Sequence, residues 1–142
     1  MTLRPDTVRE RLQVVLTNLA ALAGSGALSR ERFLADRKEQ WAAAYGLQIT
    51  VQALLDAGAH LLSAAFQEAP REYGEIVPQL VRRGVLSQEL GQRLLQVSGF
   101  RNVLVHEYAA VDYDLVHRKL QSLTDLGEFA AAIDAWLASQ GA

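Results

Sequence analysis

The 142-residue chain is 50% hydrophobic and 21% charged, a balance typical of a folded globule rather than of a disordered chain. This length fits one domain over residues 1–142 with a single buried core. The lack of cysteine excludes disulfides and thiolate metal sites and suits a reducing compartment. The net charge of -2 gives no general attraction for nucleic acid, so any contact with phosphate must be local.

The residue types predict an all-α fold, because only three prolines occur and β-branched residues are few beside Leu and Ala. No apolar run approaches the ~20 residues that a membrane span needs. No basic-then-apolar leader opens the chain. We therefore expect a cytoplasmic protein that does not contact a membrane.

The first predicted helix begins near Pro5, and its apolar residues recur at intervals of three and four. Glycines at both ends of the segment 24–26 end this helix. Ser29 then has the character of an N-cap for a short helical turn that carries Phe33 and Leu34. The apolar stripe of the first helix consists of Val8, Leu12, Val15, Leu16, Leu19 and Leu22.

Asp36 opens the longest helical pattern, which ends before Pro70. At ~30 residues this helix would run about 45 Å, long enough to span a whole bundle. Gln48, Gln52 and Asp56 lie one turn apart on it and form either an exposed face, which we favour, or the lining of a cleft. The predicted apolar stripe comprises Trp41, Ala44, Tyr45, Gln48, Val51, Leu55, Ala59, Leu62 and Phe66.

The segment 70–86 is broken by prolines and glycines, so it predicts a loop with one short helix near residues 76–83. A helix over 87–108 follows, then one capped by Asp112 and a last one that restarts near Asp125. The last helix buries Phe129, Ile133, Trp136 and Leu137. The chain therefore predicts an up-and-down bundle of four main helices plus a short one.

The stretch from Gly99 to Tyr108, GFRNVLVHEY, carries the anomaly of the sequence. Arg101 lies in the middle of an apolar stripe, where a guanidinium is costly unless it is paired or bound. Either an ion pair with Asp36 or Asp56 or a functional role would explain it. The other members of this stripe are Leu90, Leu94, Val97, Leu104, Val105 and Tyr108.

A second face of the same predicted helix carries Asn102 and His106, one turn apart. Small residues on that face allow another helix to approach closely, and this neighbour is a candidate twofold-related copy of the chain. Arg101 and His106 are about 140° apart on a straight helix. Either the helix ends or bends here, or two chains build one site together. The remaining residues of the second face are Gly91, Leu95 and Ser98.

The spacing Arg101-x4-His106-x-Tyr108, with Asn102 directly after the arginine, resembles the R-x4-H-x-Y signature of HEPN ribonucleases, specifically the HepT toxin group. The chain length and both flanks of the motif are also similar, so the resemblance covers most of the chain. It implies a HEPN-like helical bundle and a homodimer with Arg101 and His106 as the catalytic pair. It assigns Asn102 and Asp36 to supporting roles, with Asp36 holding Arg101 in place.

By the same resemblance the protein is an endoribonuclease toxin of a toxin–antitoxin pair that cleaves RNA without a metal or other cofactor. The implied partner is an MntA-like nucleotidyltransferase antitoxin, which transfers AMP units onto Tyr108. Added phosphate charge beside Arg101 would repel RNA from the site.

The residue types themselves suit this chemistry, because His transfers protons near neutral pH and Arg clamps phosphate with two-pronged geometry. The simpler alternative for His106 is a helix-end histidine that binds the last carbonyls. We expect His60 and His117 to have no special role. For the whole chain the alternatives are a non-catalytic HEPN module that binds a nucleotide or regulates a nucleotidyltransferase, and a plain dimerisation domain.

Five basic positions and one histidine form the patches available for phosphate contact. We expect most of them to be solvated helix faces rather than a binding surface. They are Arg82, Arg83, Arg93 and the cluster His117, Arg118 and Lys119.

Overall fold

The computed structural model describes residues 2–141, except for the side chain of Tyr108. These residues form α-helices and two short 3₁₀ segments with no strand among them, which confirms the predicted all-α class. The α-helices are α1 (Pro5–Gly26), α2 (Arg30–Leu34), α3 (Arg37–Phe66), α4 (Ile76–Arg82), α5 (Gln88–Arg93), α6 (Val97–His106), α7 (Tyr113–Leu120) and α8 (Leu123–Ser139). The 3₁₀ segments are η1 (Tyr73–Glu75) and η2 (Tyr108–Ala110).

Side-chain caps begin three of these helices where the sequence predicted them. The Ser29 hydroxyl accepts a hydrogen bond from the backbone N–H of Arg32 at 3.2 Å and starts α2. The Asp36 carboxylate accepts one from the N–H of Glu39 at 3.1 Å and starts α3. Asp112 caps α7 in the same way. Each cap satisfies backbone donors that have no partner within the helix.

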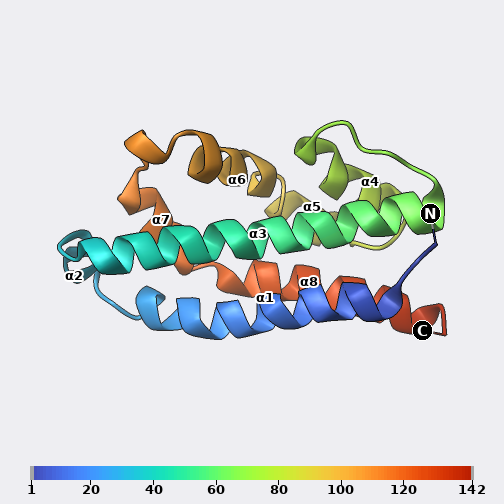
Figure 1. Cartoon of the computed structure of the whole chain (residues 1–142), viewed down its shortest axis with the longest axis horizontal. Coiled ribbons are helices and arrows are strands. Elements are labelled where there is room, and N and C mark those ends of the chain that lie inside the picture. Colours follow the sequence, from blue (N-terminus) through green and yellow to red (C-terminus); the bar gives the residue numbers. More distant parts are fainter. Residues whose placement is uncertain (1, 142) are drawn as a thin grey trace.

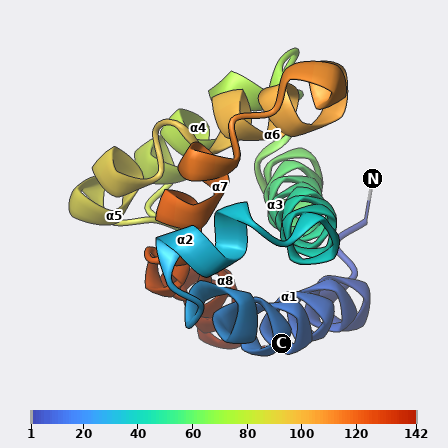
Figure 2. The ribbon, with the colours of Figure 1, turned by 90° about the vertical axis from the view of Figure 1, so that its left-hand side faces the viewer.

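Helix α3 is the central element of the bundle (Figures 1 and 2). Helices α1 and α8 lie side by side along one side of α3, α4 and α6 pack on the opposite side, and α5 lies beyond α4. The colours of Figure 1 show that α1 and α6 both run against α3. This up-and-down arrangement is the predicted one, and it places α6, which carries the motif, directly against the middle of α3.

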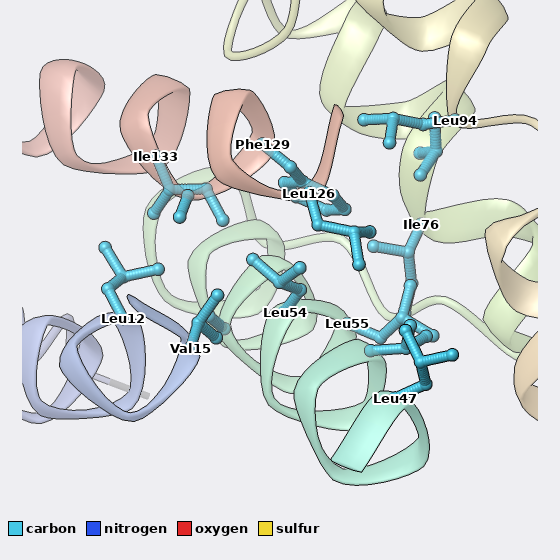
Figure 3. Packing of buried hydrophobic residues seen from close by; sticks show 14 of the residues in the cluster. Leu12, Val15, Leu47, Leu54, Leu55, Ile76, Leu94, Leu126, Phe129 and Ile133 are labelled. Carbon is cyan, nitrogen blue, oxygen red and sulfur yellow. The ribbon is translucent and has the colours of Figure 1, made fainter. Parts of the chain in front are cut away.

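The core is continuous on both sides of α3, as Figure 3 shows. Leu54 points toward Val15 of α1 and Leu126 of α8, while Leu55 points toward Ile76 of α4. All of these side chains are buried. Because burial of each large aliphatic side chain contributes about 1.5–3 kcal/mol, α3 holds the two halves of the bundle together.

By length and composition α3 could cross a membrane, contrary to the expectation that no apolar run is long enough. Gln48, Gln52 and Asp56 interrupt the apolar residues of α3, so no single uninterrupted run marks it in the sequence. In the structure α3 is the central helix of the bundle and packs against helices on both sides. A core helix passes the same test of length and composition, so packing explains its apolar character.

The predicted core stripe of α3 was wrong at its N-terminal end. Trp41 and Tyr45 are 60% and 64% exposed. The buried side of this half of the helix is formed by Ala43, Leu47 and Val51, almost opposite on the helical wheel. The three-and-four rhythm misled the prediction because α3 carries apolar residues on more than one face.

The predicted single helix over 87–108 was also wrong. A turn at residues 94–96 divides it into α5 and α6. The turn lets α5 pack on α4 and α8, whereas α6 packs on α3. Leu94 in the turn is buried and helps to fill the core between these helices.

The last helix starts two residues before Asp125, at Leu123, so Asp125 is not its cap. Asp125 and Glu128 instead each form an ion pair with Arg93 of α5. The distance from Nη1 of Arg93 to the carboxylate oxygen is 2.6 Å in both pairs. The predicted burial of Phe129, Ile133 and Leu137 is confirmed, whereas Trp136 is only half-buried. These pairs attach α5 to α8 at the surface of the bundle.

Gly91 allows the close approach of α5 to α4. A Cβ atom at this position would lie 2.4 Å from Cγ2 of Val81. Gly91 itself is buried. The helix that uses this small residue is therefore α4 of the same chain, and Gly91 does not indicate a second copy.

We predict that Gly91→Ala lowers the free energy of unfolding by about 1–3 kcal/mol, because the new methyl group forces α4 and α5 apart. The matched control is Gly24→Ala in α1, where nothing lies within 4 Å of the new Cβ. That control should leave stability unchanged or raise it by up to about 1 kcal/mol. Urea unfolding followed by circular dichroism measures both, and equal stabilities of the two variants would contradict the packing described above.

Candidate functional site

Arg101 projects from the middle of α6 and is half-buried against α3. Its Nε donates a hydrogen bond to Oε1 of Gln52 at 2.7 Å. Its guanidinium carbon lies 4.3 Å from the ring centroid of Tyr73 in η1. A cation over an aromatic face is attracted by the negative face of the ring, and the contact covers one side of the planar guanidinium.

Gln52 is oriented by two further hydrogen bonds. Its Nε2 donates to Oδ1 of Asp56 at 2.8 Å and to the hydroxyl oxygen of Tyr73 at 3.1 Å. The amide nitrogen is thereby turned toward the carboxylate, which leaves the amide oxygen facing Arg101. Asp56 thus acts on Arg101 through an amide, and the described residues contain no direct ion pair of Arg101 with Asp36 or Asp56.

The outer end of the guanidinium faces Asn102. Nη1 of Arg101 donates to Oδ1 of Asn102 at 3.0 Å, and Asn102 is exposed. Arginine has five N–H donors, and among the described side chains only the bonds at Nε and Nη1 have acceptors. The remaining donors are available to an anion such as a phosphate. Asn102 therefore contacts Arg101 in this structure rather than His106.

His106 is the last residue of α6, and its side chain is exposed. It makes no hydrogen bond or ion pair within the described part of the chain, so the structure gives no support to a helix-capping histidine. Five residues after Arg101, it lies about 7.5 Å further along the helix axis and about 140° around it. The helix does end here, as one of the sequence alternatives required.

The other predicted site residues are Asp36, which the structure does not bring to Arg101, and Tyr108. Asp36 caps α3 and is exposed, sixteen residues before Gln52, or about 24 Å along the helix. The backbone of Tyr108 opens η2 directly after α6. The side chain of Tyr108 lies outside the described part, so its predicted role stays a prediction.

The polar row on α3 lines a hollow rather than a fully exposed face. Gln48, Gln52 and Asp56 are all half-buried, and together with Arg11 of α1 they surround a shallow depression of about 240 Å³. Their burial is thus intermediate between the exposed face that we favoured and the cleft lining that was the alternative. Of these three residues, Gln52 is the one that accepts a hydrogen bond from Arg101.

Most of the predicted basic patches have structural partners. Arg93 pairs with acidic residues of α8, as described above. Arg83 pairs with Glu68 and lies 5.3 Å from the ring centroid of Phe66. Lys119 lies 5.7 Å from the ring centroid of Phe100. These contacts support the expectation that such positions serve the helix surface, and they leave the motif region as the main candidate site.

The two other histidines make local structural contacts. Nε2 of His60 accepts a hydrogen bond from the backbone N–H of Arg4 at 3.3 Å. Burial, helped by the positive charges of Arg11 and Arg4, lowers the pKa of His60. A ring nitrogen of His117 lies 2.9 Å from the carbonyl oxygen of Leu28. The described residues contain no cluster of three or more His, Cys, Asp or Glu side chains with metal-binding geometry.

Residues 15–133 match the family model described as ribonuclease HepT-like. The chain belongs to the HepT-like family. Among curated proteins, a HepT-like relative is the tRNA nuclease HepT of Aphanizomenon flos-aquae (strain 2012/KM1/D3), with 28% identity over 110 residues. The match covers 78% of this chain and 75% of that protein.

Two solved structures show the same HepT-like fold at low identity. A tri-AMPylated HEPN toxin of Shewanella oneidensis in complex with MNT antitoxin has a TM-score of 0.81 and 21% identity, covering 92% of this chain and 98% of that chain. The cytosolic protein of unknown function YutE of Bacillus subtilis has a TM-score of 0.76 and 19% identity, covering 93% and 92%.

Two residues that contact Arg101 in the structure, Gln52 and Tyr73, were not predicted as site residues from the sequence. Gln52 belongs to the polar row that we interpreted as an exposed face. Neither the residue type nor the spacing of that row indicates that Arg101 packs against it. Tyr73 lies in the segment 70–86, which is broken by prolines and glycines and has no periodic pattern. A half-buried arginine that needs an acceptor was the available signal, and it pointed only to carboxylates.

We predict that Gln52→Leu lowers the free energy of unfolding by about 1–3 kcal/mol, because it leaves a half-buried guanidinium without its acceptor. The matched control is Gln48→Leu, one turn away in the same hollow, whose side chain has no hydrogen-bond partner among the described residues. Urea titrations of both variants measure the difference. If the two variants lose the same stability, the bond to Arg101 is not the reason.

Proposed function

We propose that this chain is a metal-independent endoribonuclease and the toxin of a toxin–antitoxin pair, with Arg101 and His106 as its catalytic residues. One observation carries the proposal. Gln52 and Tyr73 fix the guanidinium of Arg101, and its other N–H groups have no acceptor among the described side chains except Asn102. His106, on the same short helix, has no hydrogen bond or ion pair in the described chain. Membership of the HepT-like family and the similarity to a tRNA nuclease support it.

In the proposed reaction the RNA supplies its own nucleophile. His106 takes the proton of a ribose 2′-OH, the 2′-oxygen attacks the adjacent phosphorus, and the bond from phosphorus to the 5′-oxygen breaks. The leaving 5′-oxygen receives a proton, which gives a 2′,3′-cyclic phosphate and a free 5′-OH. Arg101 binds the non-bridging phosphate oxygens and stabilises the charge that develops on them.

A homodimer would complete this site. The reaction needs one group that accepts a proton and one that donates a proton, and each chain carries a single motif histidine. Two copies would bring two His106 side chains, so that one acts as base and the other as acid. The angle of about 140° between Arg101 and His106 also suits a site to which two chains contribute.

The proposed regulator is a nucleotidyltransferase antitoxin that adds AMP to Tyr108. The support comes from the Shewanella oneidensis relative of the same fold, which is a tri-AMPylated toxin in complex with MNT antitoxin. Tyr108 opens the 3₁₀ segment that directly follows His106. Phosphate groups added to Tyr108 would bring negative charge to the motif region and oppose RNA binding.

The second candidate is a non-catalytic module that binds a nucleotide or regulates a nucleotidyltransferase partner. The free donors of Arg101 favour it as much as they favour catalysis, because a nucleotide phosphate could occupy them equally well. The two candidates differ in whether His106 is needed for RNA cleavage.

We predict that protein purified without a partner cleaves total RNA in the presence of EDTA. His106→Ala should reduce the rate by about 100-fold or more, because proton transfer is lost. Arg101→Ala should reduce it by a similar order, because the transition-state charge loses its partner. Gel analysis of RNA over time measures the rates.

The matched control for the loss of charge is Arg82→Ala, which removes an exposed arginine away from the motif and should keep full activity. Intact mass confirms that Tyr108 is unmodified in every preparation. Cleavage that survives both motif substitutions would disprove the catalytic assignment. A complete lack of cleavage by the unmodified wild type would favour the binding module.

We predict that coexpression with a nucleotidyltransferase antitoxin of this type increases the intact mass of the protein by whole AMP units. Tyr108→Phe should abolish the increase, because the acceptor hydroxyl is removed. Tyr113→Phe, at the start of α7, is the matched control and should keep it. An unchanged mass increase in Tyr108→Phe would place the modification at another residue.

A further inference from the structure

Two large aromatic side chains on α3 have no packing role in the described chain. Trp41 and Tyr45 are 60% and 64% exposed, although both are large enough to bury substantial apolar area. They lie one helical turn apart, so their rings occupy neighbouring positions on one face. Two exposed aromatic residues at this spacing form a patch that the fold itself does not require.

This aromatic patch lies on the side of α3 that leads to Arg101. At about 100° per residue, Trp41, Tyr45, Gln48 and Gln52 all fall within about 60° of one another. Gln52 is the residue that accepts the hydrogen bond from Arg101. The four side chains therefore form a row that begins at the start of α3 and ends at the catalytic arginine.

Helix α6 follows the same row in the opposite direction. It runs against α3 in Figure 1, so the chain moves from Arg101 back toward the N-terminal half of α3 as it reaches His106. The rise of about 7.5 Å between the two residues brings the end of α6 to roughly the level of Gln48. Along the axis of α3, Tyr45 therefore lies about one turn and Trp41 about two turns beyond the level of His106.

The charges beside the aromatic patch are mainly positive, and the neighbouring negative group is the exposed carboxylate of Asp36, which caps α3. Arg37 and Lys38 are exposed at the first turn of α3, and neither has an ion pair among the described residues. The acidic residue of that turn, Glu39, faces the other way and accepts a hydrogen bond from Ser25 of α1 at 2.8 Å. The row from Arg37 to Gln52 therefore presents two cations and no free carboxylate despite the negative net charge.

We propose that this row is the binding track for a single-stranded segment of the RNA substrate, with bases stacked on Trp41 and Tyr45. The inference rests on the proposed ribonuclease function and extends it by naming the surface that holds the strand. Cations that follow a backbone beside exposed aromatic rings are the combination that binds single strands without reading their sequence. Gln48 adds hydrogen-bonding groups between the rings and Arg101.

The track favours single strands over duplexes. Bases in a duplex are already stacked and paired, so their faces are not open to Trp41 or Tyr45. A strand that lies on the row passes from the cations at residues 37 and 38, over the two rings, to the guanidinium of Arg101. The part of the strand that follows the base stacked on Tyr45 would then reach Arg101. The phosphate that is cleaved would belong to this part of the strand.

The test measures binding of a fluorescent single-stranded oligonucleotide with 2′-O-methyl ribose, which cannot supply the attacking 2′-OH. We expect Trp41→Ala to weaken binding by about 5- to 100-fold, in line with the loss of one stacked base. Trp41→Phe keeps an aromatic ring and should restore most of the affinity. A duplex of the same sequence should bind more weakly than the single strand.

The matched controls use residues away from the row. Leu16→Ala removes an apolar side chain that is 50% exposed on α1 and should not change affinity. Lys38→Ala should reduce the slope of log affinity against log salt concentration by about one unit, because one phosphate contact is lost. Arg82→Ala should leave that slope unchanged. Thermal unfolding checks that every variant is folded. We expect all of them to fold, because the substituted side chains are exposed.

Equal affinity of wild type and Trp41→Ala for the oligonucleotide would disprove the proposed binding track. The ribonuclease proposal would be unaffected, because the RNA cleavage experiment tests it separately. Binding that depends on Trp41 in a protein that cleaves no RNA would support the track and disprove catalysis. A change of native mass in Trp41→Ala, from dimer to monomer, would assign the patch to contact between two copies and would also overturn the track.

Discussion

The hydrogen bond between Arg101 and Gln52 fixes the geometry on which the candidate site depends. A half-buried guanidinium needs an acceptor, and here the acceptor is an amide on the central helix rather than a carboxylate. Asp56 and the Tyr73 hydroxyl hold that amide in one orientation. The bond therefore ties α6 to α3 and to η1, and it directs the unused donors of the arginine outward.

Local chemistry made much of this fold predictable. Ser29, Asp36 and Asp112 begin helices because a short polar side chain satisfies nearby backbone donors, and that requirement is visible within four residues of sequence. The length of α3 followed from uninterrupted periodicity. The motif residues on α6 were found by their spacing, since Arg101 was out of place in an apolar stripe.

The remaining features depend on neighbours that are distant in the sequence. Gln52 became a site residue only because α6 crosses α3 at that turn. Trp41 and Tyr45 fitted an apolar rhythm, yet the side of α3 that is buried depends on where α1 lies. The turn at residues 94–96 separates α5, which packs on α4 and α8, from α6, which packs on α3. The apolar periodicity of residues 87–108 does not show where this turn lies.

The separation of these partners along the chain bears on when activity arises. The groups around Arg101 come from α3, η1 and α6, so they meet only after the chain between residues 52 and 101 has closed into its native loop. A nascent or partly opened chain has the long helices α1 and α3 but no assembled site. The proposed activity therefore depends on the docking of the short helix α6 against α3, in addition to the stability of the bundle as a whole.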